Sequence, residues 1–193
     1  MKELLDFLCS TAAAAGWPLS EGCLKRLSEI VKTTSIKKDE FLLKEGEVCK
    51  NLYFIHKGLL KCFYILHDTP VSDWFFGELE TIVSIDSFYD QKPSEDFIQA
   101  LEDTDLFYIS FEDLENLYRD FIEFNVIGRI LTNKYLRIWH RQARNLRMMT
   151  ADERYSFLLS KQPDLVHRVP VRDLASYLDM SRETLSRMRG RIY

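Results

Sequence analysis

The side chains of this sequence best suited to chemistry lie near its end, between Val171 and Ile192. The side chains expected to face outward on its last helix are those of Arg182, Glu183, Ser186, Arg187, Arg189 and Arg191. A guanidinium presents two parallel donors that match O6 and N7 of guanine, and a glutamate accepts from N4 of cytosine. These types predict a surface that reads DNA bases. We expect its contacts to come from Ser181, Arg182, Glu183, Thr184, Ser186, Arg187 and Arg189.

Two short helices joined by a tight turn are needed to present these side chains. Ala175 permits a close helix crossing, Asp179 falls where the turn needs a positive φ, and Ser181 is placed to cap the second helix. The spacing therefore predicts a helix-turn-helix. Its buried faces are expected to consist of Leu174, Leu178, Leu185 and Met188.

Charge is divided unevenly along the 193 residues. Residues 1–128 contain 12 Lys and Arg against 24 Asp and Glu, a net charge of −12, whereas residues 129–193 contain 14 against 6, a net charge of +8. An acidic body with a basic end predicts that only the second part meets a polyanion. An ordinary solvated helix face is the alternative explanation of the basic run.

Several classes of protein are not indicated by the composition. No run of eighteen apolar residues occurs and the start lacks a basic leader, so we expect no membrane span, no export and a cytoplasmic location. No arrangement of nucleophile and base indicates an enzyme. Without a CxxC pair, the cysteines are interpreted as buried thiols and not as ligands of a metal or cluster: Cys9, Cys23, Cys49 and Cys62.

Hydrophobic periodicity separates helical from extended regions. Residues 1–34 have helical spacing, with a helix start at Ser20, and residues 35–110 contain short β-branched and aromatic runs between turns, with room for one short helix in 82–89. Helical spacing returns at 111–120 and again from Ile122 to about Leu146. This order predicts an α+β chain with a jelly-roll-like β-roll (a double-stranded β-helix) flanked by helices, a long helix, and a C-terminal helix-turn-helix.

The long helix has a broad apolar face, which predicts pairing with a symmetry mate in addition to packing on its own domain. The alternative is a helix packed only within its own chain. A capping pattern at Thr150 marks a boundary. We therefore divide the chain into a sensor domain (1–121), a dimerisation and connecting helix (122–148) and a helix-turn-helix domain (149–193). Dimer contacts are expected from Phe124, Ile127, Leu131, Tyr135 and Ile138.

This order of elements resembles the CRP/FNR family of bacterial transcription regulators over nearly the whole chain. The motifs that carry the resemblance are Leu42–Glu47, Leu52–Ile55 followed by Lys57-Gly58, Ala100–Glu102, and Ala175 and Leu178 with Ser181–Arg187. The resemblance implies that the β-roll senses a small molecule, that the long helix dimerises, and that the last helix enters the major groove with Arg182, Glu183 and Arg187 at base-contacting positions. It also implies double-stranded DNA, a second copy of the chain and RNA polymerase as partners.

The sensor departs from that family pattern. Relatives that bind a cyclic nucleotide have a Gly-Glu-Leu motif and then an Arg-Ser/Thr-Ala triplet, whose arginine pairs with the phosphate. Ser94-Glu95-Asp96 occupies the place of the triplet, and Gly77-Glu78-Leu79 is interpreted as the turn before this cassette. A buried phosphate without a cationic partner is costly to desolvate. We expect that cyclic AMP is not bound and that no cofactor is needed.

A ligand pocket, if one is open, is expected at Ile82, Ser84, Ser87, Phe88 and Ser94. Three states remain possible for it: empty, filled by its own side chains, or suited to an unknown, uncharged effector. Family members usually add a β-hairpin wing after the last helix, whereas this sequence ends at Tyr193, so we expect phosphate contacts from Arg189, Arg191 and the long helix. The alternative function is a ligand-sensing or protein-interaction β-roll protein whose truncated helix-turn-helix no longer binds DNA.

Overall fold

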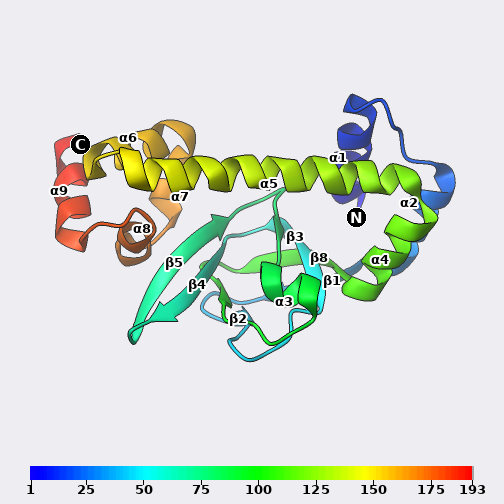
Figure 1. Cartoon of the computed structure of the whole chain (residues 1–193), viewed down its shortest axis with the longest axis horizontal. Helices are drawn as coiled ribbons and strands as arrows, with labels where there is room; N and C mark the ends of the chain where they lie inside the picture. The colour runs from blue at the N-terminus through cyan, green and yellow to red at the C-terminus, as the bar shows by residue number, and fades with distance from the viewer. Residues whose placement is uncertain (193) are drawn as a thin grey trace.

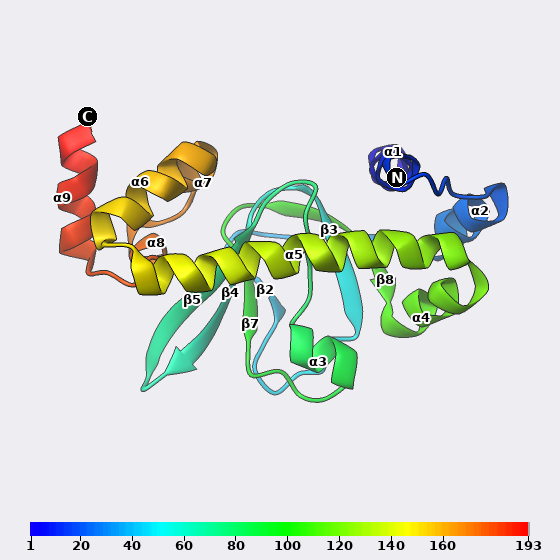
Figure 2. The same ribbon diagram turned by 45° about the horizontal axis from the view of Figure 1, so that its top comes forward.

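One long helix, α5 (Ile122–Met148), runs along the molecule and joins its two parts (Figure 1). The computed structural model describes residues 1–192, with side chains as far as Gly190, so the phosphate contact expected of Arg191 lies outside the described side chains. The β-roll lies along the middle of α5, and the C-terminal helices gather at the end of α5 away from α2 (Figure 2). The predicted α+β architecture with its β-roll and long helix is confirmed.

The N-terminal region is helical over a shorter stretch than the periodicity predicts. It contains α1 (Lys2–Ala14) and α2 (Glu21–Ile30), and Ser20 caps α2 by accepting a hydrogen bond from the Cys23 amide at 3.3 Å. Residues 32–34, predicted to be helical, instead belong to strand β1 (Lys32–Ile36). The β-branched pair Thr33 and Thr34 favours an extended backbone, and β1 pairs with β8 along its length.

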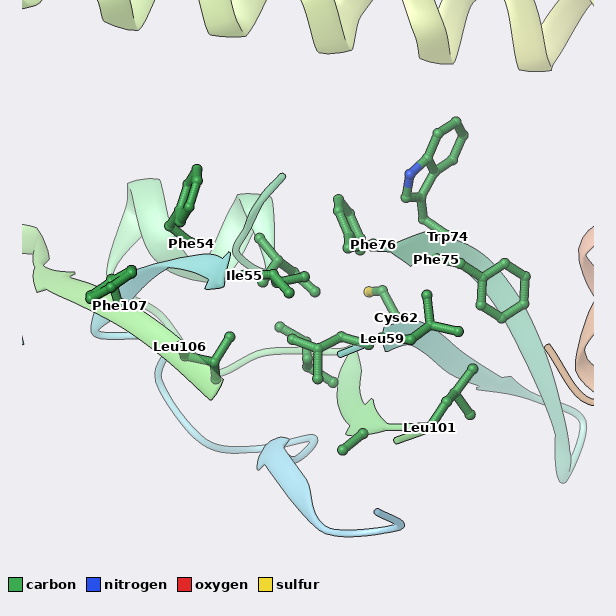
Figure 3. Close-up of a cluster of buried hydrophobic side chains, with 14 of the residues drawn as sticks. Phe54, Ile55, Leu59, Cys62, Trp74, Phe75, Phe76, Leu101, Leu106 and Phe107 are labelled. Carbon is green, nitrogen blue, oxygen red and sulfur yellow. The ribbon is translucent and has the colours of Figure 1, made fainter. Parts of the chain in front are cut away.

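Two four-stranded antiparallel sheets form the β-roll, in the orders β1-β8-β3-β6 and β2-β7-β4-β5. Apolar side chains from both sheets form one cluster, and Figure 3 draws Ile55 and Leu106 of the first sheet together with Cys62 and Phe76 of the second. Strand β5 has a strand neighbour on one side only. The remaining strands are β2 (Phe41–Leu43), β3 (Asn51–Lys57), β4 (Leu60–Leu66), β5 (Thr69–Phe76), β6 (Thr81–Ile82), β7 (Phe97–Ala100) and β8 (Thr104–Ser110).

Helices follow the roll in the predicted order. The short helix α3 (Ile85–Asp90) interrupts the strands, and α4 (Phe111–Asp120) starts at a cap in which Ser110 accepts from the Asp113 amide at 3.1 Å. On α5, Gly128 leaves room for the ring of Tyr118, which a β-carbon would meet within 3 Å. The start of α5 thereby packs closely on α4.

The C-terminal part consists of four helices: α6 (Ala151–Lys161), α7 (Pro163–Arg168), α8 (Val171–Tyr177) and α9 (Arg182–Ile192). The expected cap at Thr150 is a complete capping box with Glu153. Asp179, between α8 and α9, has a φ of 50°, as the spacing predicts. None of the helices within residues 1–192 has the length and apolar character that crossing a bilayer requires.

Candidate nucleic-acid interface

Helix α9 presents a polar face to solvent and an apolar face to the rest of its domain. Leu185 and Met188 are buried against Leu174 and Leu178 of the preceding segment, which is the predicted core of the helix pair. The side chains expected to contact nucleic acid divide as follows: Ser181, Arg182, Glu183, Ser186 and Arg187 are exposed, and Thr184 and Arg189 are half-buried. Helix α9, which carries most of them, lies at one end of the molecule (Figure 1).

The first turn of α9 is held by Ser181. Its hydroxyl oxygen accepts from the Thr184 amide at 3.2 Å, as expected of an N-cap. Hydrogen bonds from the Glu183 amide and from Ser181 lower the pKa of the Glu183 carboxyl, so this side chain is an ionised acceptor at neutral pH. The Arg187 guanidinium donates to Thr184 Oγ1 at 3.4 Å. An acceptor and two guanidinium groups are therefore ordered on one exposed face.

Two arginines counted in the basic end have structural partners. Arg189 donates to the Val166 carbonyl at 2.6 Å, so its guanidinium supports α7, and the expectation that it contacts DNA is not supported. Arg154 donates to the carbonyls of Met149, Leu178 and Asp179, each at 2.8 Å. It thus joins the start of α6 to the turn before α9.

The residues predicted to form the dimer contact pack wholly or partly on the chain's own core, and a dimer contact through them stays a prediction. Phe124 and Ile127 are buried, and Leu131 and Ile138 pack against the core. The Tyr135 hydroxyl accepts from the Thr81 amide at 2.8 Å, which ties α5 to β6. The broad apolar stripe is therefore accounted for by packing within the chain.

A different stripe of α5 is largely open to solvent, although its Trp139 is half-buried and also packs against the core. Leu136 is 61% exposed and Leu146 is 37% exposed, and Trp139 and Ala143 lie between them at alternating spacings of three and four residues. That spacing is the heptad pattern of paired helices. We call the set Leu136, Trp139, Ala143 and Leu146 the outer stripe.

The three serines predicted to line a ligand pocket form hydrogen bonds within the chain. Ser84 Oγ donates to Asp96 Oδ2 at 2.6 Å, and Ser94 Oγ donates to Ser84 Oγ at 2.9 Å. Ser87 Oγ donates to the Lys92 carbonyl at 2.5 Å. With Phe88 also buried, these residues fill the cassette with side chains of the chain itself. The Asp96 carboxylate takes part in this network through its bond from Ser84.

An apolar cavity of about 270 Å³ lies beside the cassette, between α5 and the roll. Ile82 is the predicted pocket residue that reaches it, together with Phe76 and Val83 from the roll. The α5 side of its wall includes Leu136 and Trp139 of the outer stripe. Lysine and arginine are absent from this lining, so the cavity suits an uncharged molecule better than a phosphate.

Comparison with known proteins defines the middle of the chain. Residues 33–121 match a family model described as "Cyclic nucleotide-binding domain". The match covers less than half of the chain, and we use its name below for residues 33–121 alone, as the name of a fold. No curated protein matches the sequence.

Solved structures extend the likeness from this domain to most of the chain. FixK2 from Bradyrhizobium japonicum is 22% identical, with a TM-score of 0.71 and 84% of each chain covered. A CRP/FNR family transcriptional regulator from Eubacterium rectale is 18% identical, with a TM-score of 0.69, covering 88% of this chain and 82% of its own. A CooA variant from Carboxydothermus hydrogenoformans is 17% identical, with a TM-score of 0.68, covering 89% and 79%. The chain therefore shares the fold of these proteins.

The cyclic nucleotide-binding domain also holds the helix pair through contacts that sequence reasoning missed. Lys61 Nζ of β4 lies 3.0 Å from Asp173 Oδ2 of α8, and the two residues are only 3% and 5% exposed. The Ser72 amide of β5 donates to Ser176 Oγ at 3.0 Å. A lysine inside the apolar run Leu59–Leu66 was the available signal, because a buried ammonium needs an anionic partner.

Arg168 of α7 forms a second link. It donates to Glu78 at 2.8 and 2.9 Å and to Glu102 at 2.7 and 3.0 Å. Glu78 belongs to the Gly77-Glu78-Leu79 turn before the cassette and also accepts from the Gly58 amide at 3.0 Å. This turn therefore binds the neighbouring domain.

Arg168 should control the titration of Glu78. Hydrogen bonds from Arg168 lower the pKa of Glu78 from 4.5 to about 2. A lowered pKa means that the link is complete above about pH 4.5 and is lost as the pH falls toward 2. We expect carboxyl NMR titration to give a midpoint near 2, and Arg168→Ala to return it toward 4.5. An unchanged midpoint in Arg168→Ala would contradict this link.

Proposed function

We propose that this chain is a homodimeric, cytoplasmic transcription regulator of CRP/FNR type that reads a palindromic DNA site through α9. The observation that carries the proposal is the exposed face of Arg182, Glu183 and Arg187 on a helix capped by Ser181. These groups match the donors and acceptors of G·C pairs in the major groove. The domain division 1–121, 122–148 and 149–193 is part of the proposal.

The basic end of the chain supports DNA as the partner. Arg137, Arg141, Arg144 and Arg147 of α5 are exposed, and no acidic residue occurs between Glu123 and Asp152. Contacts from such residues to phosphates supply affinity that does not depend on sequence. Arg189 is left out of this set, because it is bonded to Val166.

Dimerisation is proposed along the outer stripe. In a parallel pair of α5 helices, Leu136, Trp139, Ala143 and Leu146 occupy the positions that face the partner. The exposed arginines Arg137, Arg141 and Arg144 lie outside these positions, which keeps like charges away from the contact. A symmetric pair places two α9 helices on two half-sites of a palindrome. RNA polymerase is a further proposed partner.

Regulation is proposed to proceed without cyclic AMP. The cassette is occupied by Ser84, Ser94 and Asp96, which bond to one another. An effector, where one acts, is proposed to be uncharged and to enter the apolar cavity beside Ile82. Such a molecule would contact Leu136 and Trp139 of the outer stripe and would therefore change the strength of the dimer contact.

Selection of binding sites from random double-stranded DNA tests the proposal. We expect a palindromic consensus, with half-sites about 10 base pairs apart or a multiple of that distance. Binding measured at two salt concentrations should weaken with a logarithmic slope of about −0.9 for each phosphate neutralised. Recovery of no consensus at low salt would refute sequence-specific reading. Complex formation with a protein that is insensitive to DNA would favour the alternative of an interaction module.

A further inference from the structure

The helix pair is fastened to the cyclic nucleotide-binding domain by a buried ion pair. Lys61 and Asp173 are both almost fully excluded from solvent, and Arg172 Nε lies 3.3 Å from the second oxygen of Asp173. The Lys61 ammonium also lies 4.6 Å from the ring centre of Phe63. Removing one partner of such a pair leaves the other as an uncompensated buried charge, which destabilises the contact strongly.

The same surface covers the free edge of the sheet. Tyr177 of α8 packs edge-on against Trp74 at 5.7 Å and Phe75 at 5.3 Å between ring centres. Figure 3 shows Trp74 pointing from β5 toward α5. Because β5 is the last strand of its sheet, the bond from the Ser72 amide to Ser176 satisfies an edge group that no strand pairs.

Hydrogen bonds in the turn hold helices α8 and α9 together. The Met180 amide donates to the Ala175 carbonyl at 3.0 Å and the Asp179 amide to Ser176 at 3.1 Å, which closes the turn. Arg154 of α6 donates hydrogen bonds to the carbonyls of Leu178 and Asp179 in this turn. The orientation of α8 on the β4–β5 hairpin therefore sets the orientation of α9.

We propose that the β4–β5 hairpin positions α9 for DNA, with Lys61 and Asp173 as positioning residues. This rests on the proposed function. The docked arrangement leaves Arg182, Glu183 and Arg187 exposed, so docking on the hairpin does not cover the face proposed to read DNA. Both half-sites of a palindrome are reached at once because each α9 is fixed relative to its own α5.

Lys61→Met tests the proposal, because methionine fills the space of the lysine stem without the charge. We expect hydrogen exchange at the Ser72 amide to accelerate about a hundredfold as α8 detaches. Affinity for the selected palindrome should fall about tenfold, while binding to non-specific DNA at low salt stays unchanged. Lys61→Met with Asp173→Leu should restore both quantities, since an apolar pair can replace a buried ion pair.

Lys57→Met is the matched control, because Lys57 is an exposed lysine on strand β3, which belongs to the other sheet. Arg168→Gln provides a second variant at a less buried link, and it should also raise Ser72 exchange and lower the preference for the palindrome. Thermal unfolding checks that each variant folds.

Three results would overturn the proposal. They are unchanged Ser72 exchange in Lys61→Met, faster exchange with unchanged palindrome affinity, and a rise in affinity on release of α8, which would make docking inhibitory. If the unmodified protein selects no DNA site, the proposed function fails, and the exchange measurement still reports whether the hairpin holds α8.

Discussion

Arg182→Ala combined with Arg187→Ala should weaken binding to the selected site by about 2–6 kcal/mol, since each arginine that reads a base contributes about 1–3 kcal/mol. Both side chains are exposed and lie outside the buried face of α9, so the fold should be retained. The consensus should relax at the positions that the two guanidinium groups contact. Fluorescence anisotropy on the selected site and on base-substituted sites measures both effects.

Arg119→Ala controls for the loss of positive charge, because Arg119 lies on α4, far along the chain from α9. It should leave the affinity and the consensus unchanged. A double variant that keeps the full preference for the selected site would show that α9 does not read the bases. A uniform loss across all DNA sequences would assign the two arginines to phosphates instead.

Leu136→Glu should separate the dimer. Burying a leucine contributes about 1.5–3 kcal/mol, and each dimer loses two such contacts and gains two apposed carboxylates. The side chain is 61% exposed in the single chain, so the fold of the chain should not suffer. Analytical ultracentrifugation should find monomers at concentrations where the unmodified protein is dimeric, and affinity for the palindrome should fall with it.

Arg137→Glu is the matched control, because it places the same carboxylate on the next residue of α5, outside the outer stripe. It should remain dimeric. If Leu136→Glu forms dimers that dissociate at the same concentration as those of the unmodified protein, the interface lies outside the outer stripe. If the unmodified protein is a monomer, the proposed dimer does not exist.

The Arg182→Ala/Arg187→Ala variant and the Leu136→Glu variant separate the two proposed roles, which are base reading by α9 and dimerisation by α5. Loss of base reading leaves a dimer that still binds DNA by charge, whereas loss of the dimer leaves a reader that engages a single half-site. The cavity beside the cassette borders Leu136 and Trp139, so an uncharged effector would act on the second property and not on the first.

The sequence by itself determined the elements that depend on local interactions. Periodicity predicted the strands and long helices, and short-range chemistry predicted the caps at Ser20 and Thr150 and the positive φ of Asp179. Each depends on groups within a few residues of one another, so their spacing is visible in the chain. The helical assignment of residues 32–34 failed because pairing with β8 is a long-range contact.

Tertiary structure alone decided which apolar surfaces remain exposed and which charged side chains form ion pairs. The apolar stripe with Phe124 and Ile127 turned inward onto the roll, leaving the outer stripe open, and periodicity cannot tell which of two apolar stripes finds the core. Lys61 and Asp173 are 112 residues apart, and Glu78 and Arg168 are 90 apart. Such partners meet only because the completed sheet offers a free edge on which α8 can pack.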